Sequence, residues 1–447
     1  MRKINFNPTL YIFMSILILL FIDYDLFVAF ALFFIVYLFF VKQNIEVTRV
    51  HKLLTYICVF LFFFIIRLLP IFDKNYLHLW NRIAQQNYLI GDGYFLSENI
   101  FLDLQLTLFS LSCNTNYSTY KIKYSSDYLD SSILTCPYDT PYGYVLNFIQ
   151  INGNIWNLTV VIATILLFSI YIIYIDTVKN LNGKKFLLCT LLFLSPPINF
   201  LLFRLNIDIF IFLIVFIFAF KLRENFIIKT AAVFIATLIK FYTISIIFFD
   251  LVFKFIEKSY RHFVALTILL IVSIMYVIFF ESNSEFLIWF YKPIESNINF
   301  GIFNDALYIS QIFGISWIIS YIILLFLVFG FVIIIPKEKV YLDLNSNELA
   351  VLALFLSTAL FTNFDYRLVF LLLLIKPFLL NKINLSLISM TIFMYTSPSL
   401  LHAYESYYKI IRNDEIFFLD YSFYFFVAIC LKTLWLRVFN PEFNGAN

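Results

Sequence analysis

The chain has few glycines and few charged residues, and these shortages exclude several classes of function. Only nine of its 447 residues are glycine, and neither phosphate-binding pattern, GxGxxG or GxxxxGK[ST], occurs. Charged residues make up 13%, whereas an average soluble protein has about 25%. ATP-driven transport by this chain alone is therefore not expected. The net charge of +3 gives no sign of nucleic-acid binding.

Histidine and cysteine are also scarce. The sequence holds four scattered histidines and five cysteines, with no CxxC or HExxH pattern, so neither a metal site nor a cofactor is predicted. A divalent metal could still take part in the chemistry. Cys113 and Cys136 share one polar segment and could form a disulfide in an oxidising compartment, or remain free.

Apolar residues dominate the composition. They make up 62% of the chain and occur in runs that charged loops separate. This pattern is typical of an all-α polytopic membrane protein. We expect roughly twelve transmembrane helices, at about residues 9–22, 26–41, 53–72, 155–175, 186–203, 209–222, 263–280, 308–335, 349–362, 368–380, 385–400 and 418–439.

Basic residues in the short loops predict the orientation of the chain. The loop of residues 42–52 carries two lysines and an arginine, and residues 179–185 carry three lysines. By the positive-inside rule these loops face the cytoplasm, which places both termini there as well. The segment of residues 73–154, the one long hydrophilic region, then faces outward. Its apolar residues recur at helical spacing, so we expect amphipathic helices on the outer surface.

The apolar run of residues 231–253 has basic residues on both sides. Before the run come Arg223 and Lys229, and after it come Lys254, Lys258 and Arg261. A single crossing would put one basic group outside, against the positive-inside rule. A re-entrant pair of half-helices that turns near Lys240 satisfies both ends. Irregular backbone at that depth needs a protein-lined cavity.

Three polar clusters interrupt apolar sequence, and the predicted topology brings all three to the outer side. Charged residues at lipid depth are expensive, so a functional site is the default interpretation. Solvated turns and structural pairs, such as Asp208 with Arg204 or Asp365 with Arg367, are the alternatives. The clusters contain Arg204, Asn206 and Asp208, then Lys240 and Tyr242, then Asp365, Tyr366 and Arg367, with Arg67 as a fourth cation.

Several motifs resemble those of a known enzyme family. SPPINFLLFRLNIDIF is similar to the Ser-Pro, Arg-x-Asn-x-Asp signature of bacterial membrane proteins related to glycosyltransferase family eighty-seven, of the GT-C superfamily. Leu205 stands where those proteins usually have Gly. LIKFYT resembles their Leu-Lys-x-Tyr-Pro segment, with Thr243 in place of Pro, and FDYRL their Tyr-Arg-Leu motif. CPYDTPYGY is similar to their Tyr-Pro-Pro stretch.

The resemblance implies transfer of a sugar from a polyprenyl-phosphate donor to a glycan, lipid or protein acceptor at the outer face of a bacterial inner membrane. By analogy, Asp73 or Asp92 is the catalytic base. Several cations gathered at one interface also suit an anionic headgroup, so we expect the phosphate to be bound by Arg204, Lys240, Arg367 and Arg67. It divides the chain into an N-terminal hairpin with its basic loop (1–52), a catalytic core (53–380) and C-terminal helices (381–447).

Three alternatives stay open at this point. An O-antigen polymerase or ligase would also have roughly twelve spans, although its largest loop is typically late in the chain. A secondary transporter or lipid flippase typically has repeated halves with matching helix breaks, and the break at Lys240 has no second copy. An inactive paralogue is the third alternative, since the paired acidic residues typical of GT-C enzymes are not clear here.

Overall fold

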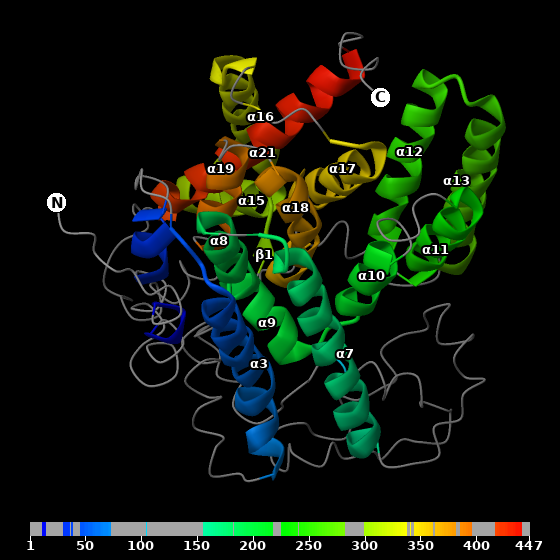
Figure 1. Ribbon diagram of the computed structural model, residues 1–447. Helices are drawn as coiled ribbons and strands as arrows, with labels where there is room; N and C mark the ends of the chain where they lie inside the picture. Colours follow the sequence, from blue (N-terminus) through cyan, green and yellow to red (C-terminus); the bar gives the residue numbers. More distant parts are fainter. Residues whose placement is uncertain are drawn as a thin grey trace, which may run out of the picture.

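The computed structural model describes residues 11–14, 30–35, 37–38, 45–72, 104, 155–181, 183–217, 225–239, 241–281, 299–337, 340, 344–360, 363–380, 385–395 and 416–439. Within these residues the chain is almost entirely helical, and its strands are two residues long (Figure 1). The all-α prediction is therefore confirmed. The first two predicted spans, at 9–22 and 26–41, lie mostly outside the described residues.

Helices α3 (Arg49–Phe72) and α7 (Ile155–Val178) pack side by side and reach the lower end of the view in Figure 1. The bounds of both lie close to those of predicted spans, because apolar residues fill most of each helix. Aromatic rings fill the contact: the Phe64 and Phe168 centroids lie 4.5 Å apart. The Tyr171 hydroxyl donates a hydrogen bond to the Tyr56 carbonyl at 3.0 Å.

The single helix predicted for residues 186–203 is wrong. The structure has α8 (Lys184–Phe193) and α9 (Pro196–Arg204), separated at Leu194 and Ser195. Ser195 is extended, with φ −65° and ψ 155°. Proline has no N–H to donate, its ring clashes with the preceding turn, and it disfavours helical backbone in the residue before it. Pro196 and Pro197 therefore end one helix and begin the next.

The middle of the chain folds as a compact group of helices. A short helix, α10 (Asp208–Ile214), is followed by α11 (Phe226–Ile239), the 3₁₀ turn η3 (Phe241–Thr243), α12 (Ile244–Ile256) and α13 (Tyr260–Glu281). Helix α12 packs against both α11 and α13. Figure 1 shows α12 and α13 standing together at the right.

Helices α11 and α12 form an antiparallel hairpin that turns around position 240. Lys229 contacts Asp250, and the Thr243 hydroxyl donates to the Thr237 hydroxyl at 3.0 Å. Each of these pairs is nearly symmetric about position 240, as expected for two helices running in opposite directions. The predicted break and reversal of direction are therefore present.

The helix predicted for residues 308–335 is also divided. Helix α15 (Ile302–Phe313) ends at Gly314, and α16 (Trp317–Ile334) follows. Gly314 has φ 65°, a left-handed conformation that ends helices and that glycine adopts at low cost. The two helices pack against each other, and the rings of Phe303 on α15 and Trp317 on α16 lie 5.2 Å apart.

The C-terminal helices supply a large share of the buried core. Nearly all side chains of α17 (Ser346–Leu360) are buried, and α21 (Ile416–Phe439) packs against α16, α17 and α19. The helix predicted for residues 368–380 begins as a 3₁₀ helix in η5 and continues as an α-helix in α18. The remaining elements are η5 (Asp365–Leu371), α18 (Leu372–Leu380) and α19 (Leu385–Tyr395).

Two described segments, Leu158–Val178 and Trp317–Ile334, are long and apolar enough, by length and composition, to cross a membrane. The breaks at Pro196, Gly314 and η3 leave several of the other helices too short for a full crossing. Twelve spans, the membrane depth of the hairpin and the amphipathic helices of residues 73–154 stay predictions.

Candidate functional site

The break between α9 and α10 carries the first predicted polar cluster. Arg204 is the last residue of α9, and Leu205 adopts the left-handed conformation, with φ 48° and ψ 51°. A left-handed non-glycine residue costs roughly 1–2 kcal/mol. The Asn206 side-chain oxygen then accepts a hydrogen bond from the Asp208 amide at 3.1 Å, which starts α10.

Asp208 connects this break to the turn of the α11–α12 hairpin. Its side chain is fully buried, and its Oδ1 accepts a hydrogen bond from the Tyr242 hydroxyl at 2.5 Å. Tyr242 belongs to η3, so two of the predicted clusters are in direct contact. Because water cannot replace a lost partner at a buried position, breaking this hydrogen bond would be costly.

The third predicted cluster begins η5, which packs against both α9 and α10. The Phe370 ring lies edge-on to Tyr242, with centroids 6.0 Å apart and planes at 74°. It also contacts Phe212 of α10, at 6.1 Å. The α9–α10 break, η3 and η5 therefore meet around Tyr242 and Phe370.

A short ladder fixes the start of η5. Strand β1 (Asn299–Phe300) pairs antiparallel with β2 (Asn363–Phe364), so that Asn299 lies opposite Phe364 and Phe300 opposite Asn363. Asp365 follows β2 directly. The position of the third cluster thus depends on a segment more than sixty residues earlier in the chain.

The predicted site residues differ in how much of them is described. Asn206, Asp208 and Tyr242 are described in full and lie together. The backbone of Arg67, Arg204, Asp365, Tyr366 and Arg367 lies in α3, α9 and η5, but their side chains are outside the described part of the structure. Asp73, Asp92 and Lys240 lie outside the described residues, as do Cys113 and Cys136. The phosphate-binding and base assignments stay predictions.

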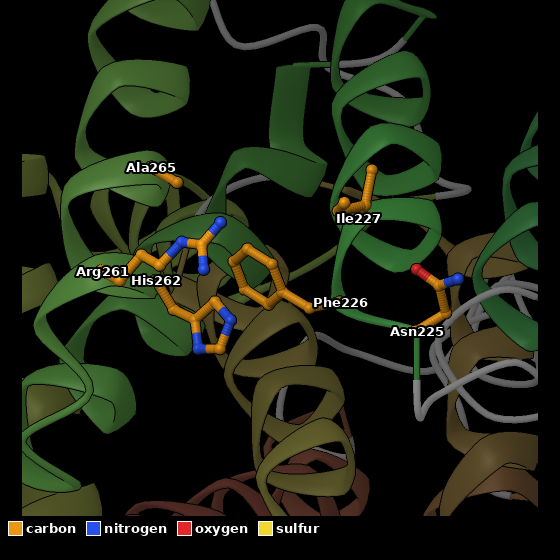
Figure 2. Close-up of a pocket in the computed structure, with 6 residues that line it drawn as sticks. All are labelled: Asn225, Phe226, Ile227, Arg261, His262 and Ala265. Atoms are coloured by element: carbon orange, nitrogen blue, oxygen red, sulfur yellow. The ribbon is translucent and has the colours of Figure 1, made fainter.

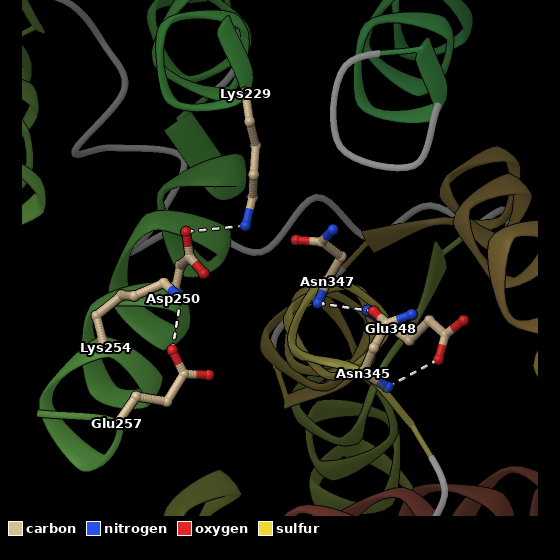
Figure 3. A network of polar contacts seen from close by, with 7 residues as sticks. All are labelled: Lys229, Asp250, Lys254, Glu257, Asn345, Asn347 and Glu348. Carbon is tan, nitrogen blue, oxygen red and sulfur yellow. Dashed lines mark hydrogen bonds and ion pairs between the residues drawn. The ribbon is translucent and has the colours of Figure 1, made fainter. Parts of the chain in front are cut away.

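Sequence reasoning missed a buried ion pair inside the hairpin. The Lys229 ammonium lies 2.9 Å from Asp250 Oδ2, and the two side chains are 7% and 3% exposed (Figure 3). The second Asp250 oxygen has no hydrogen-bond partner among the described residues. The signal was present in the sequence, since the two charges are placed symmetrically about the predicted turn.

A second carboxyl group was also missed. Asp305 of α15 is half-buried, and its Oδ2 accepts a hydrogen bond from the Tyr424 hydroxyl of α21 at 2.5 Å. Burial raises the pKa of Asp305 to about 7, although the hydrogen bond from Tyr424 opposes this shift. The two residues are 119 positions apart, and neither belongs to a motif.

Within the described residues, no group of three or more His, Cys, Asp or Glu side chains could hold a metal ion. The fully described part of the site is therefore a carboxyl group, a phenol and aromatic rings at a helix break, next to the backbone positions of Arg204 and Arg367. Neither a protein-family model, a curated protein nor a solved structure matches the chain.

Proposed function

We propose that this chain is an integral membrane glycosyltransferase of the GT-C type, which moves a sugar from a polyprenyl-phosphate donor to an acceptor at the outer face of a bacterial inner membrane. One observation carries the proposal: the α9–α10 break, η3 and η5, predicted from scattered motifs to form one site, pack around Tyr242 and Phe370.

The proposed reaction needs cations near the phosphate and a base near the acceptor. The bond from the sugar anomeric carbon to the phosphate oxygen breaks, and the acceptor oxygen forms the new bond. Arg204, Lys240 and Arg367, with Arg67, stabilise the negative charge on the departing polyprenyl phosphate. Asp73 or Asp92 takes the proton of the acceptor hydroxyl. Asp208 and Tyr242 act as positioning residues that hold two of the cation-bearing segments together.

Exposed apolar stripes support the membrane setting. On α7, Val161, Ile165, Phe168 and Ile172 are all exposed and recur at helical spacing. Large apolar side chains of α16 are exposed around most of that helix. Such surfaces would be unfavourable in water, whereas lipid covers them without cost. Roughly twelve crossings, with both termini in the cytoplasm, belong to this proposal.

The re-entrant geometry fits the same setting. Phe226, at the start of α11, lies against His262, at the start of α13, with ring centroids 4.0 Å apart. The start of α11 and the start of α13, which carries Arg261, are thus at one end of the hairpin. An O-antigen polymerase or ligase and a transporter or flippase are the competing functions, and the assay below separates them from sugar transfer to a simple acceptor.

The test is transfer of radiolabelled sugar from defined polyprenyl-phosphate donors by the purified protein. Arg204→Ala is expected to reduce kcat by roughly 100-fold or more, since it removes a charge that stabilises the transition state. Asp73→Asn or Asp92→Asn, whichever removes the base, should abolish transfer. Tyr242→Phe keeps the ring and loses the hydrogen bond, so it should raise the donor KM about tenfold while the fold survives.

Lys179→Ala serves as the matched control. Lys179 lies after α7, is 54% exposed and pairs with Asp176, so its loss should leave turnover unchanged. Transfer at the wild-type rate by both Arg204→Ala and Asp73→Asn would remove the assigned roles. Absence of any transfer, together with movement of intact lipid-linked sugar between leaflets, would favour the flippase.

A further inference from the structure

A pocket of about 610 Å³ lies between the beginnings of α11 and α13, at the end of the hairpin away from η3. Its walls come from two elements. Asn225, Phe226 and Ile227 line it from α11, and Arg261, His262 and Ala265 from α13 (Figure 2). None of these residues belongs to the proposed catalytic site.

The polar wall of the pocket carries positive charge. Arg261 is exposed and makes no ion pair with any described residue. The His262 ring is held between the Ser259 hydroxyl, which is hydrogen-bonded to its Nδ1 at 2.8 Å, and the ring of Phe226. Lys258, also exposed, is three residues before Arg261. An arginine and a fixed imidazole can together contact the oxygens of a phosphate.

The other wall is apolar, and it continues along α13. Ile227 is 76% exposed, and Val264, Ile268 and Ile271 each expose more than half of their surface. Ala265, Ile268, Val272 and Met275 follow Arg261 at helical spacing, so they share one face of α13 with it. From Ala265 to Met275 this stripe is about 15 Å long, comparable to an acyl chain.

A cation with an apolar stripe beside it matches an amphiphile that has an anionic head. A small phosphate ester would use only the polar wall and would leave the stripe uncovered. In the proposed topology this end of the hairpin faces the cytoplasm, where anionic lipids attract basic residues by about 1 kcal/mol each. The positive charge of the pocket and the apolar stripe beside it therefore favour an anionic lipid over a small phosphate ester.

We propose that this pocket binds the headgroup of an anionic phospholipid of the inner leaflet, with Arg261 and His262 on the phosphate and an acyl chain along Ile268 and Met275. This inference rests on the membrane setting of the proposed function. It adds a lipid site about one hairpin length away from the sugar-transfer site.

The experiment uses the full chain in detergent, with phosphatidylglycerol and phosphatidylcholine of equal chain length as probes and bound lipid counted by native mass spectrometry. Wild type should prefer phosphatidylglycerol by about tenfold, the effect expected of a charge-assisted contact. Arg261→Gln with His262→Gln should remove the preference, and Ile268→Asp should weaken binding of both lipids. Lys179→Gln, which removes an exposed cation just after α7, should behave as wild type.

Three outcomes would overturn the proposal. Equal binding of the two lipids by wild type would show that the pocket does not discriminate between lipids by the charge of the headgroup. A preference that survives Arg261→Gln with His262→Gln would place the lipid elsewhere. Competition by glycerol phosphate as strong as by the lipid would indicate a soluble phosphate ester. Alkaline extraction of membranes tests the setting separately: a chain that remains in the pellet but shows no preference fails only the lipid inference.

Discussion

At the scale of single residues, Asp305 couples the stability of the fold to pH. Its pKa is raised to about 7 by burial, from a value near 3.8 in the unfolded chain. Tyr424 is the titratable group that contacts it among the described residues. Between these two pH values the folded chain holds a proton that the unfolded chain has released. Stability therefore falls as pH rises from about 4 to about 7, and it is level above that range.

We predict that Asp305→Asn removes this pH dependence, because the amide is neutral at every pH and can still accept the hydrogen bond from Tyr424. At pH 8 the variant should be more stable than wild type by roughly 2 kcal/mol. This gain is smaller than the full pKa shift implies, because solvent partly screens the half-buried carboxyl. Thermal unfolding of the purified protein between pH 4 and pH 8.5 measures both effects.

Two further variants sharpen this test. Tyr424→Phe removes the donor that stabilises ionised Asp305, so the fall in stability should extend to higher pH. Asp176→Asn changes a partly exposed carboxyl of α7 and should keep the wild-type slope. A slope that is the same in wild type and Asp305→Asn would contradict the assignment.

At the scale of elements, the α11–α12 hairpin depends on the pair Lys229–Asp250. Both side chains are buried, so neither charge can be hydrated if the other is removed. We predict that Lys229→Met or Asp250→Leu alone destabilises the protein by about 3–5 kcal/mol, since each leaves an uncompensated buried charge. The double variant should recover most of this loss, because two apolar side chains of similar size can pack in place of the pair.

The exposed pair Lys179–Asp176 provides the comparison. Its members are 54% and 26% exposed, and breaking it with Asp176→Asn should cost less than about 1 kcal/mol. Denaturant unfolding of the wild type, the two single variants and the double variant gives the coupling energy of Lys229–Asp250, and that of Asp176→Asn gives the cost of breaking the exposed pair. Additive effects of Lys229→Met and Asp250→Leu would mean that the two residues do not stabilise each other.

The same elements show what the sequence could predict. The bounds of α3, α7, α13 and α21 lie within a few residues of the expected spans, because long apolar runs fix them. The two divided helices were missed although Pro196 and Gly314 are visible in the sequence. In both cases the apolar run continues past the break, so the composition gives no sign that the backbone changes direction there.

The candidate site was predictable as a set of segments and not as a set of contacts. Polar residues inside apolar runs identified the α9–α10 break, the hairpin turn and η5. The partner of Asp208 was not predicted, because Tyr242 is 34 residues away and reaches it only through the register of the hairpin. Asp305 carried no signal, since its raised pKa depends on burial against α21.

At the scale of the whole molecule, the distribution of charge separates two ends of the structure. Lys432 donates from its ammonium to the carbonyls of Val332, at 2.8 Å, and Ile335, and so caps the end of α16. Arg437 donates to the Leu344 carbonyl at 3.0 Å. The end of α16, the end of α21 and the turn between α12 and α13 all lie toward the top of Figure 1. The proposed sugar-transfer site lies beside η3, at the other end of α12 from the α12–α13 turn.

This arrangement makes a prediction about membrane topology. If residues 225–258 enter and leave the membrane on one side, Asn225→Cys and Lys258→Cys should both react with an impermeant maleimide from the cytoplasmic side, in a background without other cysteines. Ser131→Cys, in the segment of residues 73–154, should react from the outside. Labelling of Asn225→Cys and Lys258→Cys from opposite sides would mean a single crossing. The basic end of the hairpin would then be divided between two compartments, and the lipid pocket between α11 and α13 could not form.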